Sequence, residues 1–233
     1  MQNRWVGSIG DFGKLALLRS LVNGRRVAVC WYVTRRNGED PADDEDGHQD
    51  RYFHYLRRLD DFRSLAPDIF DALKSIVDGT RPELRCITAL ETSGLLDGAI
   101  FHRKEVPDRA ASRQHWSVDL VRSTGEADFV FLDPDNGIQG KRLTPKHVSL
   151  SEIAALRRED RTLMIGQRHS GRRSEARVLA ERMRSLGCHR VELIRFRVAS
   201  PRFYVIADHN DAISERLALF SRKWGDWVRT YAI

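Results

Sequence analysis

The fold is decided by the stretch Ala127-Asp128-Phe129-Val130-Phe131-Leu132-Asp133-Pro134-Asp135-Asn136-Gly137-Ile138. A short apolar run ends abruptly in two acids, a proline, an asparagine and a glycine. This pattern is typical of a buried strand that delivers polar groups to an opening at the carboxyl edge of a parallel sheet. We therefore expect an active site at Asp133, Pro134, Asp135 and Asn136.

Apolar strands and amphipathic helices alternate on both sides of this stretch. The expected strands are residues 26–34, 84–90, 99–106, 127–132, 162–165, 191–198 and 202–207. The expected helices are residues 15–22, 51–59, 68–77, 110–122, 145–158 (one helix or two short ones), 174–186 and 211–231. This order predicts one α/β domain over residues 1–233, with a doubly wound, mainly parallel Rossmann-like sheet and a C-terminal antiparallel hairpin.

The composition is that of a globular protein. Hydrophobic residues make up 41% and charged residues 31% of the 233 residues, which is enough apolar material for a sizeable core. No apolar run reaches the roughly 20 residues of a membrane span, and the first residues do not lead into a signal-peptide core. We expect a cytoplasmic protein with no membrane partner. The three widely spaced cysteines, Cys30, Cys86 and Cys188, are expected to be reduced thiols.

The charge distribution points to a polyanionic partner. Lys and Arg number 39 against 33 Asp and Glu, and the net charge is +6 although residues 39–50 are strongly acidic. We expect residues 35–50 to form a mobile surface loop, with a metal-binding loop as the alternative. The basic residues gather at Arg157-Arg158, Arg168 to Arg177, and Arg190, Arg195, Arg197 and Arg202. Arginine suits phosphate, so RNA or DNA is the expected partner, whereas a solvated arginine surface is the alternative.

The N-terminal segment offers candidate ligand-binding groups. Gly7, Gly10 and Gly13 stand at three-residue spacing before the first helix, for which Asp11 is the expected N-cap. No strand precedes them, so they are not a dinucleotide-binding fingerprint. They predict instead a helix start that faces a ligand, with Lys14 as a cation one turn in.

Glu91 is the third candidate for cofactor binding. If residues 84–90 form the second strand of a doubly wound sheet, Glu91 stands at its tip and can accept hydrogen bonds from a ribose. A solvated glutamate at a strand end is the alternative. His48 and His54 are six residues apart, which matches no common zinc-ligand spacing, so we assign no metal ligand to them.

The element order resembles the class I S-adenosylmethionine-dependent methyltransferase fold. Within it, Gly10-Asp11-Phe12-Gly13 and Asp133-Pro134-Asp135-Asn136 resemble two motifs of the YhiR-like ribosomal RNA adenine-N6-methyltransferases. Those enzymes carry a Gly-Asn-x-Ala-Asp helix and a strand that ends Asp-Pro-Pro-Tyr. Residues 127–140 also resemble a bacterial family with an Asp-Pro-Asp-Asn-Gly motif, which implies a fold and no chemistry.

The methyltransferase resemblance implies S-adenosylmethionine as cofactor and an amino group of a nucleic-acid base as substrate. Asp133 and the Pro134 carbonyl would accept the two amine hydrogens and so free the nitrogen lone pair for methylation. Asp135 and Asn136 would complete the site, and Asp11, Lys14 and Glu91 are the candidates for cofactor binding.

Two other functions fit the same residues. Asp133 and Asp135, with Glu91 or Asp11, could hold Mg²⁺ in a metal-dependent nuclease or phosphodiesterase. The third possibility is a nucleic-acid-binding member of the fold without catalysis, or a purely structural loop in which Asp135 and Asn136 cap the following turn and Gly137 supplies a positive φ.

Overall fold

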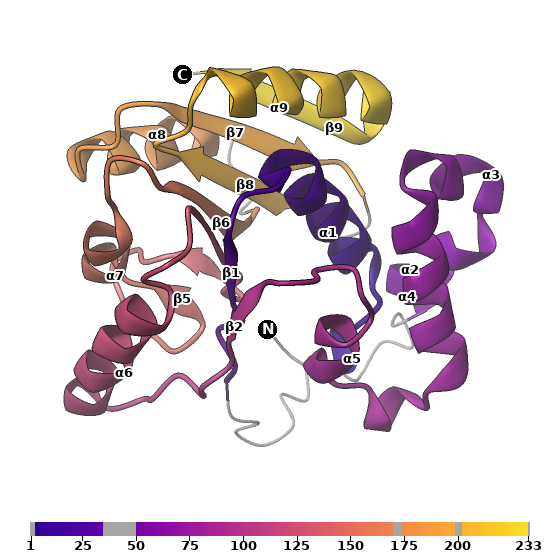
Figure 1. Ribbon diagram of the computed structural model, residues 1–233, viewed down its shortest axis with the longest axis horizontal. Helices are drawn as coiled ribbons and strands as arrows, with labels where there is room; N and C mark the ends of the chain where they lie inside the picture. Colours follow the sequence, from indigo (N-terminus) through magenta and orange to yellow (C-terminus); the bar gives the residue numbers. More distant parts are fainter. Residues whose placement is uncertain (1–2, 35–49, 170–173, 199–201, 233) are drawn as a thin grey trace.

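The computed structural model describes residues 3–34, 50–169, 174–198 and 202–232 (Figure 1). The predicted mobile acidic loop at about 35–50 lies outside this part of the chain, apart from Asp50. The strands are β1 (Val27–Cys30), β2 (Ile100–His102), β3 (Phe129–Leu132), β4 (Gly137–Ile138), β5 (His147–Val148), β6 (Thr162–Arg168), β7 (Val191–Phe196), β8 (Arg202–Ala207) and β9 (Val228–Ala232). The α-helices are α1 (Ile9–Val22), α2 (Asp50–Phe53), α3 (Leu59–Phe62), α4 (Pro67–Gly79), α5 (Ile87–Glu91), α6 (Ala110–Ser123), α7 (Leu150–Leu156), α8 (Glu175–Ser185) and α9 (Asp211–Trp224).

A seven-stranded sheet in the order β2-β1-β3-β6-β8-β7-β9 forms the centre of the molecule. Strands β2, β1, β3 and β6 are parallel neighbours, and the last three strands pair antiparallel to their neighbours. Because β7 is antiparallel to β8, and β8 to β6, five of the seven strands run in one direction. The predicted α/β class, the mainly parallel sheet and the β7–β8 hairpin are confirmed.

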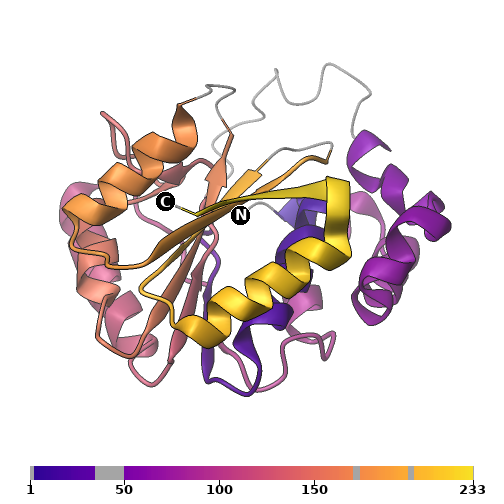
Figure 2. The same cartoon turned by 90° about the horizontal axis from the view of Figure 1, so that it is seen from above.

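Helices cover both faces of the sheet (Figure 2). On one face, α1 and α9 cover the sheet, and their Phe12 and Trp224 belong to the same buried cluster as Phe131. On the other face, α6, α7 and α8 bury Trp116, Ile153, Leu179 and their neighbours against Val130 and Leu132. Phe129 and Phe131 belong to the first cluster and Val130 and Leu132 to the second, as alternation along a strand requires. All four residues of β3 are therefore apolar because the strand is buried on both faces of the sheet.

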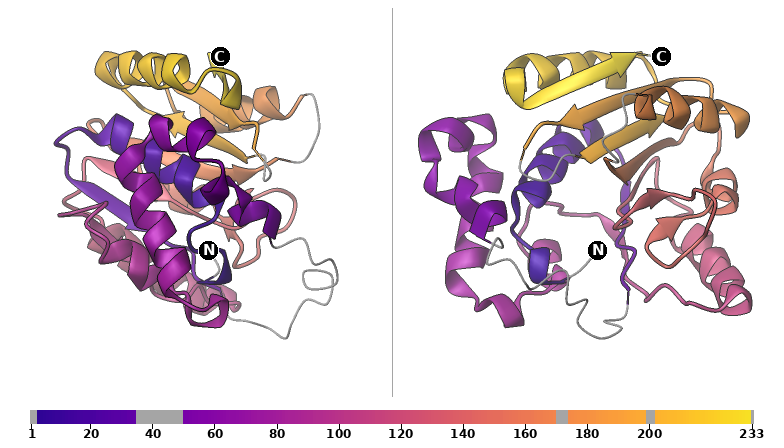
Figure 3. Two further views of the ribbon diagram at one scale, coloured as in Figure 1. Left: turned by 90° about the vertical axis from the view of Figure 1, so that its right-hand side faces the viewer. Right: turned by 180° about the vertical axis from the view of Figure 1, so that it is seen from behind.

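Helices α2 to α4 form an outer layer beside α1 (Figure 3). Helix α4 contacts α1 directly and turns Ile69, Phe70 and Leu73 inward. Pro67 occupies its first turn, where the missing backbone N–H has no helical partner to lose. The predicted helix at 68–77 is confirmed, while the one predicted at 51–59 is split into α2, a 3₁₀ turn at His54–Arg57 and α3.

Helix α1 leads directly into β1 through a tight turn at Asn23 and Gly24, which both have positive φ. The amino end of α1 therefore returns to the carboxyl edge of the parallel strands. The helix begins at Ile9, earlier than predicted, and its N-cap position is Ser8 rather than Asp11. Asp11 lies within the first turn instead.

The strand predicted at 84–90 is wrong. This segment forms a 3₁₀ turn at Pro82–Leu84 and then α5, which ends at Glu91. Its two buried residues, Ile87 and Leu90, are three positions apart, a spacing that places them on one side of a helical turn. Short apolar runs of this length do not distinguish a strand from a buried helix. Consequently β3, predicted as the fourth strand, is the third strand of the sheet along the chain.

Two predicted helices are shorter than expected. In 145–158, only Leu150–Leu156 is helical, because a capping box at Ser149 and Glu152 starts the helix after β5. In 211–231, α9 ends at Trp224, where Gly225 takes a positive φ of 49°. The chain then forms β9 at the edge of the sheet, next to β7.

None of the helices in the described ranges combines the length and the apolar character needed to cross a bilayer.

Candidate functional site

The candidate site lies where the strand order changes direction. The chain moves from β1 to β2 on one side of β1, whereas β3 and β6 follow on its other side. In open α/β sheets, ligands bind outside the carboxyl ends of the strands at such a switch point. Asp133 follows β3 directly at this point, and its backbone N–H donates to the Cys30 carbonyl of β1 at 3.0 Å.

Lys14 joins the two stretches that the sequence singles out. Its Nζ lies 2.7 Å from Asp133 Oδ2 and 2.7 Å from Asp11 Oδ1. All three side chains are almost fully buried, with 4–6% of their surface exposed. The structure therefore brings Asp11, Lys14 and Asp133 into one cluster.

The start of α1 is anchored around Asp11. Asp11 Oδ2 accepts a hydrogen bond from the Gly7 N–H at 2.8 Å, and the Tyr55 hydroxyl donates to the Gly7 carbonyl at 2.9 Å. Gly7 has a φ of +86°, a conformation that few other residues adopt. Asp11, in the first turn of α1, thus fixes the residue that precedes the N-cap Ser8, although it is not the N-cap residue itself.

The two carboxyl groups of the cluster differ in acidity. Burial acts to raise the pKa of Asp133, but the Lys14 ammonium and Arg202 outweigh it and hold the pKa below its usual range. Burial raises the pKa of Asp11, and the Asp133 charge adds to the rise. Burial opposes the charge of Lys14, yet the two carboxylates keep its pKa above the ordinary value. The cluster is thus best described as a Lys14–Asp133 ion pair with Asp11 as the carboxyl that protonates more readily.

One oxygen of Asp133 remains available. Among the residues that the structure describes, Oδ1 has no hydrogen-bond donor, while Oδ2 is bound to Lys14. Gly166 of β6 stands beside it, and a Cβ at Gly166 would lie 3.4 Å from Oδ1. Because residue 166 is a glycine, no side chain from this position covers the Oδ1 oxygen.

Trp31 forms an aromatic wall of the cluster. The Lys14 ammonium lies 5.1 Å from the centroid of the Trp31 ring, and Phe101 stacks on the same ring. The Trp31 indole N–H donates to Glu91 at 3.0 Å, and Arg103 donates to the other oxygen of Glu91 at 2.7 Å. Glu91 therefore reaches the site through Trp31, from the end of α5 and not from the predicted strand tip.

The remaining predicted site residues are fixed in a loop. Pro134 is buried, whereas Asp135 and Asn136 are partly exposed. The Asn136 N–H donates to the Lys146 carbonyl, and the Asn136 carbonyl accepts from the Arg168 N–H. Gly137 takes a φ of +107°, as the turn reading predicts. Asn136 carries an amide where the adenine methyltransferase motif has an aromatic ring.

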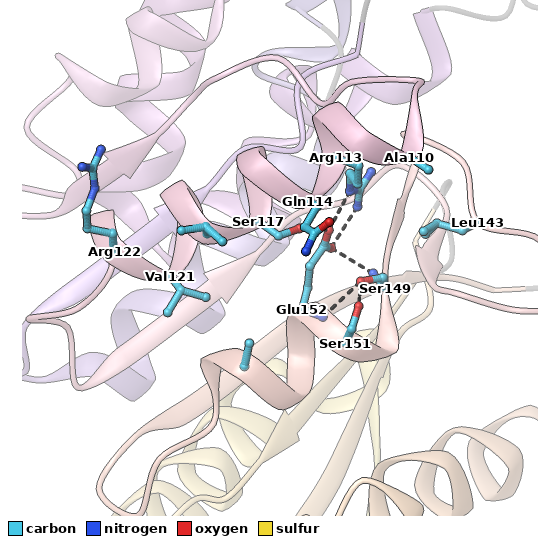
Figure 4. A pocket seen from close by; sticks show the side chains of 12 residues that line it. Ala110, Arg113, Gln114, Ser117, Val121, Arg122, Leu143, Ser149, Ser151 and Glu152 are labelled. Carbon is cyan, nitrogen blue, oxygen red and sulfur yellow. Dashed lines mark hydrogen bonds and ion pairs between the residues drawn. The ribbon is translucent and has the colours of Figure 1, made fainter.

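A second polar centre, not predicted from the sequence, lies on the other face of the sheet between α6 and α7 (Figure 4). Glu152 accepts hydrogen bonds from Arg113 (2.6 and 2.9 Å), the Tyr32 hydroxyl (2.9 Å) and the Ser117 hydroxyl (2.8 Å). It borders a cavity of about 740 Å³ whose lining includes Val121 and Leu143. Because both carboxylate oxygens of Glu152 accept hydrogen bonds, we infer that this centre holds α6, α7 and the segment after β1 together. The Ser149-x-x-Glu152 capping-box pattern was the available sequence signal for it.

The predicted metal alternative gains no further ligands from the fold. Within residues 3–34, 50–169, 174–198 and 202–232, no group of three or more His, Cys, Asp or Glu side chains has the arrangement of a metal site. The cationic neighbour of Asp133 is the ammonium of Lys14.

No protein-family model matches the chain, and a search of curated proteins finds no significant match.

Proposed function

We propose that this protein is an S-adenosylmethionine-dependent, methyltransferase-like enzyme that acts on an amino group of a nucleic-acid base. The observation that carries the proposal is the state of Asp133 at the switch point. Its Oδ2 is held by Lys14, and its Oδ1 is directed beside the bare backbone of Gly166. A buried, ionised carboxylate with one fixed and one available oxygen is suited to accept a hydrogen from an amine.

Lys14 has a positioning role in this proposal. Its ion pair keeps Asp133 charged at neutral pH although the side chain is buried. The second amine hydrogen would go to the Pro134 carbonyl, as in the resembled motif. When bound, the cofactor supplies the methyl group on a sulfonium centre. Asn136, Asp135 and the net basic surface would contact the base and its flanking phosphates.

The carboxyl end of β1 differs from the usual cofactor cradle. Trp31 and Tyr32 are both fully buried where a Gly-x-Gly loop would leave backbone N–H groups open. These residues do not fit the usual contact to the methionine part of the cofactor, and we derive no contact there. Glu91 remains the candidate to bind the ribose of the cofactor, and Asp11 remains the candidate to contact its cationic sulfonium centre.

Binding of the cofactor tests the proposal directly. Thermal unfolding and titration calorimetry are run with S-adenosylmethionine and S-adenosylhomocysteine, since a ligand at 100 times its Kd stabilises the folded state by about 2.7 kcal/mol. Transfer of labelled methyl groups to RNA and DNA then identifies the substrate class. The absence of binding by both compounds would contradict the proposal. Binding of nucleic acid without methyl transfer would favour the non-catalytic reading.

The magnesium-dependent nuclease stays a second prediction from the sequence, and no contact in the structure favours it. The same unfolding assay with Mg²⁺ examines it. A magnesium-dependent shift that Asp133→Asn abolishes would support a metal site at this carboxylate.

A further inference from the structure

Two arginines of neighbouring strands face each other at the edge of the sheet that carries Asp133. Arg168 is the last residue of β6 and Arg202 the first of β8, and the two are direct partners in the antiparallel register. Direct partners have Cβ atoms about 4.5–5.5 Å apart, and like charges at such positions destabilise a sheet. The register therefore places two arginine side chains next to each other on the sheet, where their charges repel.

No described residue neutralises either guanidinium by direct contact. In the described part of the chain, the side chains of Arg168 and Arg202 make no hydrogen bond, ion pair or ring contact. Some other arginines near strand ends do have acidic partners, such as Arg103 with Glu91 and Arg190 with Asp211. The pair is thus a local excess of positive charge.

The pair lies on the same face of the sheet as Asp133. Met164 of β6 and Tyr204 of β8 belong to the cluster that contains Phe131, and side chains two residues apart share a face. Asp133, Gly166 and Arg168 therefore share the face of Phe131, and Arg202 shares the face of Tyr204. The Arg168 N–H also donates to the Asn136 carbonyl at 3.3 Å, which joins the pair to the Asp133–Asn136 loop.

Arg202 acts electrostatically on the candidate site. Burial acts to raise the pKa of both Asp133 and Tyr204, and the Arg202 charge opposes this rise at both groups. For Asp133 the effect of Lys14 is larger, and the pKa of Tyr204 stays above its usual value. An anion bound between the two arginines would therefore lie on the same face and at the same edge of the sheet as Asp133.

We propose that Arg168 and Arg202 form a phosphate clamp that binds the backbone of a single nucleic-acid strand and sets its position relative to Asp133. Two adjacent guanidinium forks provide donors in the planar geometry that phosphate oxygens accept, and a bound phosphate removes the repulsion between them. The inference rests on the proposed function for the nature of the strand, but the clamp can be tested without methyl transfer.

A matched pair of arginines serves as the control. Arg195 of β7 and Arg229 of β9 are also direct partners in register, at the same edge of the sheet. They alternate with Ile194 and Val228, which face the Phe131 side, so they lie on the other face. The variants Arg168→Gln/Arg202→Gln and Arg195→Gln/Arg229→Gln therefore remove equal charge from opposite faces.

The experiment measures binding of a labelled 12-nucleotide single strand by fluorescence anisotropy at several salt concentrations. For single strands, the slope of log K against log salt changes by about 0.7 for each phosphate contact. We expect Arg168→Gln/Arg202→Gln to weaken binding at low salt at least tenfold and to reduce the slope by about 1.4. The control variant is expected to change the slope by less than half of that value.

Three outcomes would overturn the clamp: absence of nucleic-acid binding by the unmodified protein, unchanged binding by Arg168→Gln/Arg202→Gln, or equal losses in both double variants. Arg168→Lys/Arg202→Lys, which keeps both charges, is expected to retain most of the slope. Thermal unfolding verifies that the variants are folded, and a lower midpoint for Arg168→Gln/Arg202→Gln would also contradict an unneutralised pair. If the protein binds neither cofactor compound but the clamp variants behave as expected, the proposed methyl transfer is contradicted and the phosphate clamp is supported.

Discussion

Lys14 of α1 and Asp133 at the end of β3 are 119 residues apart in the chain, and their ammonium and carboxylate groups meet at 2.7 Å. The contact ties the helix that precedes the sheet to the strand that follows its switch point. Asp11 completes the cluster on the other side of the ammonium. The position and charge of Asp133 therefore depend on a residue that is distant in the sequence.

Removal of the ammonium is expected to destabilise the protein strongly. Lys14→Met leaves two buried acids without their cation, and loss of one partner of a buried pair typically costs about 3–5 kcal/mol. Urea unfolding measures the change in the free energy of unfolding. Arg19→Met is the control, because the Arg19–Asp68 pair is exposed and such pairs contribute about 0–1 kcal/mol. Equal effects of the two substitutions would contradict this account.

The double variant Lys14→Met/Asp133→Asn tests whether the effect comes from the pair itself. In Lys14→Met, both Asp11 and Asp133 lose their cation, whereas in the double variant only Asp11 does. We therefore expect the double variant to be more stable than the sum of the two single losses predicts. The coupling free energy of residues in such contact is about 0.5–3 kcal/mol. Purely additive losses would show that Lys14 and Asp133 act independently.

Glu152 is expected to control part of the acid sensitivity. Burial acts to raise its pKa, but the hydrogen bonds from Arg113 outweigh it and the pKa is below the usual value of 4.5. Its contribution to stability is therefore complete above about pH 4.5 and is lost as the pH falls through the lowered pKa. Glu152→Gln should be much less stable than the unmodified protein at pH 7, and the difference should shrink as the pH falls below 4.5.

Unfolding by urea at a series of pH values measures this difference. Glu159→Gln, at an exposed position, is the control and should follow the unmodified protein throughout. A difference between the Glu152→Gln variant and the unmodified protein that stays constant down to pH 3 would contradict a lowered pKa for Glu152.

The sequence carried enough information to predict the sheet and its polar edge. Apolar strands such as Phe129–Leu132 are buried on both faces, so their letters are nearly uninterrupted and easily recognised. The position of Asp133 at the carboxyl edge follows from strand direction alone. The meeting of Lys14 with Asp133 did not follow, because it depends on the tight turn at Asn23 and Gly24 that returns α1 to that edge.

Short segments were the main source of error. The amino-acid sequence of residues 84–90 is typical of a strand, but the segment leads into α5. Tertiary packing of Ile87 and Leu90 decides between strand and helix in such a short apolar segment. The strand β9 was missed because its aromatic and charged residues continue the helical pattern of α9 past Gly225. The centre of Arg113 and Glu152 joins α6 to α7, and neither helix alone indicates the partner.

Loss of the Asp133 charge is expected to abolish the proposed reaction while leaving cofactor binding in place. Asp133→Asn retains the shape of the side chain but weakens its acceptance of an amine hydrogen, and such a change reduces general-base catalysis by about 10²-fold or more. Methyl transfer and cofactor affinity are measured separately on the folded variant. Asp128→Asn is the control, because Asp128 lies at the other end of the strand beside Arg26. Transfer at the unmodified rate by Asp133→Asn would remove Asp133 from the reaction.

Gly166 is expected to matter for function more than for stability. A Cβ at this position would lie 3.4 Å from Asp133 Oδ1, which is ordinary van der Waals contact, and Gly166 is not among the residues with positive φ. Gly166→Ala should therefore leave the free energy of unfolding within about 1 kcal/mol of the unmodified value, or raise it slightly, because alanine restricts the unfolded chain. The added methyl group would, however, occupy the space beside the available oxygen, so we expect methyl transfer to fall at least tenfold.

Gly13→Ala provides the opposite case. A Cβ there would lie 2.8 Å from Phe196, and overpacking of this kind costs about 1–3 kcal/mol. Urea unfolding and initial rates of methyl transfer, compared for both variants, separate loss of space at the site from loss of stability. If Gly166→Ala retains full activity, the space beside Asp133 Oδ1 is not where the amine binds. If it is as unstable as Gly13→Ala, Gly166 is required for packing, and its absent side chain carries no information about a substrate.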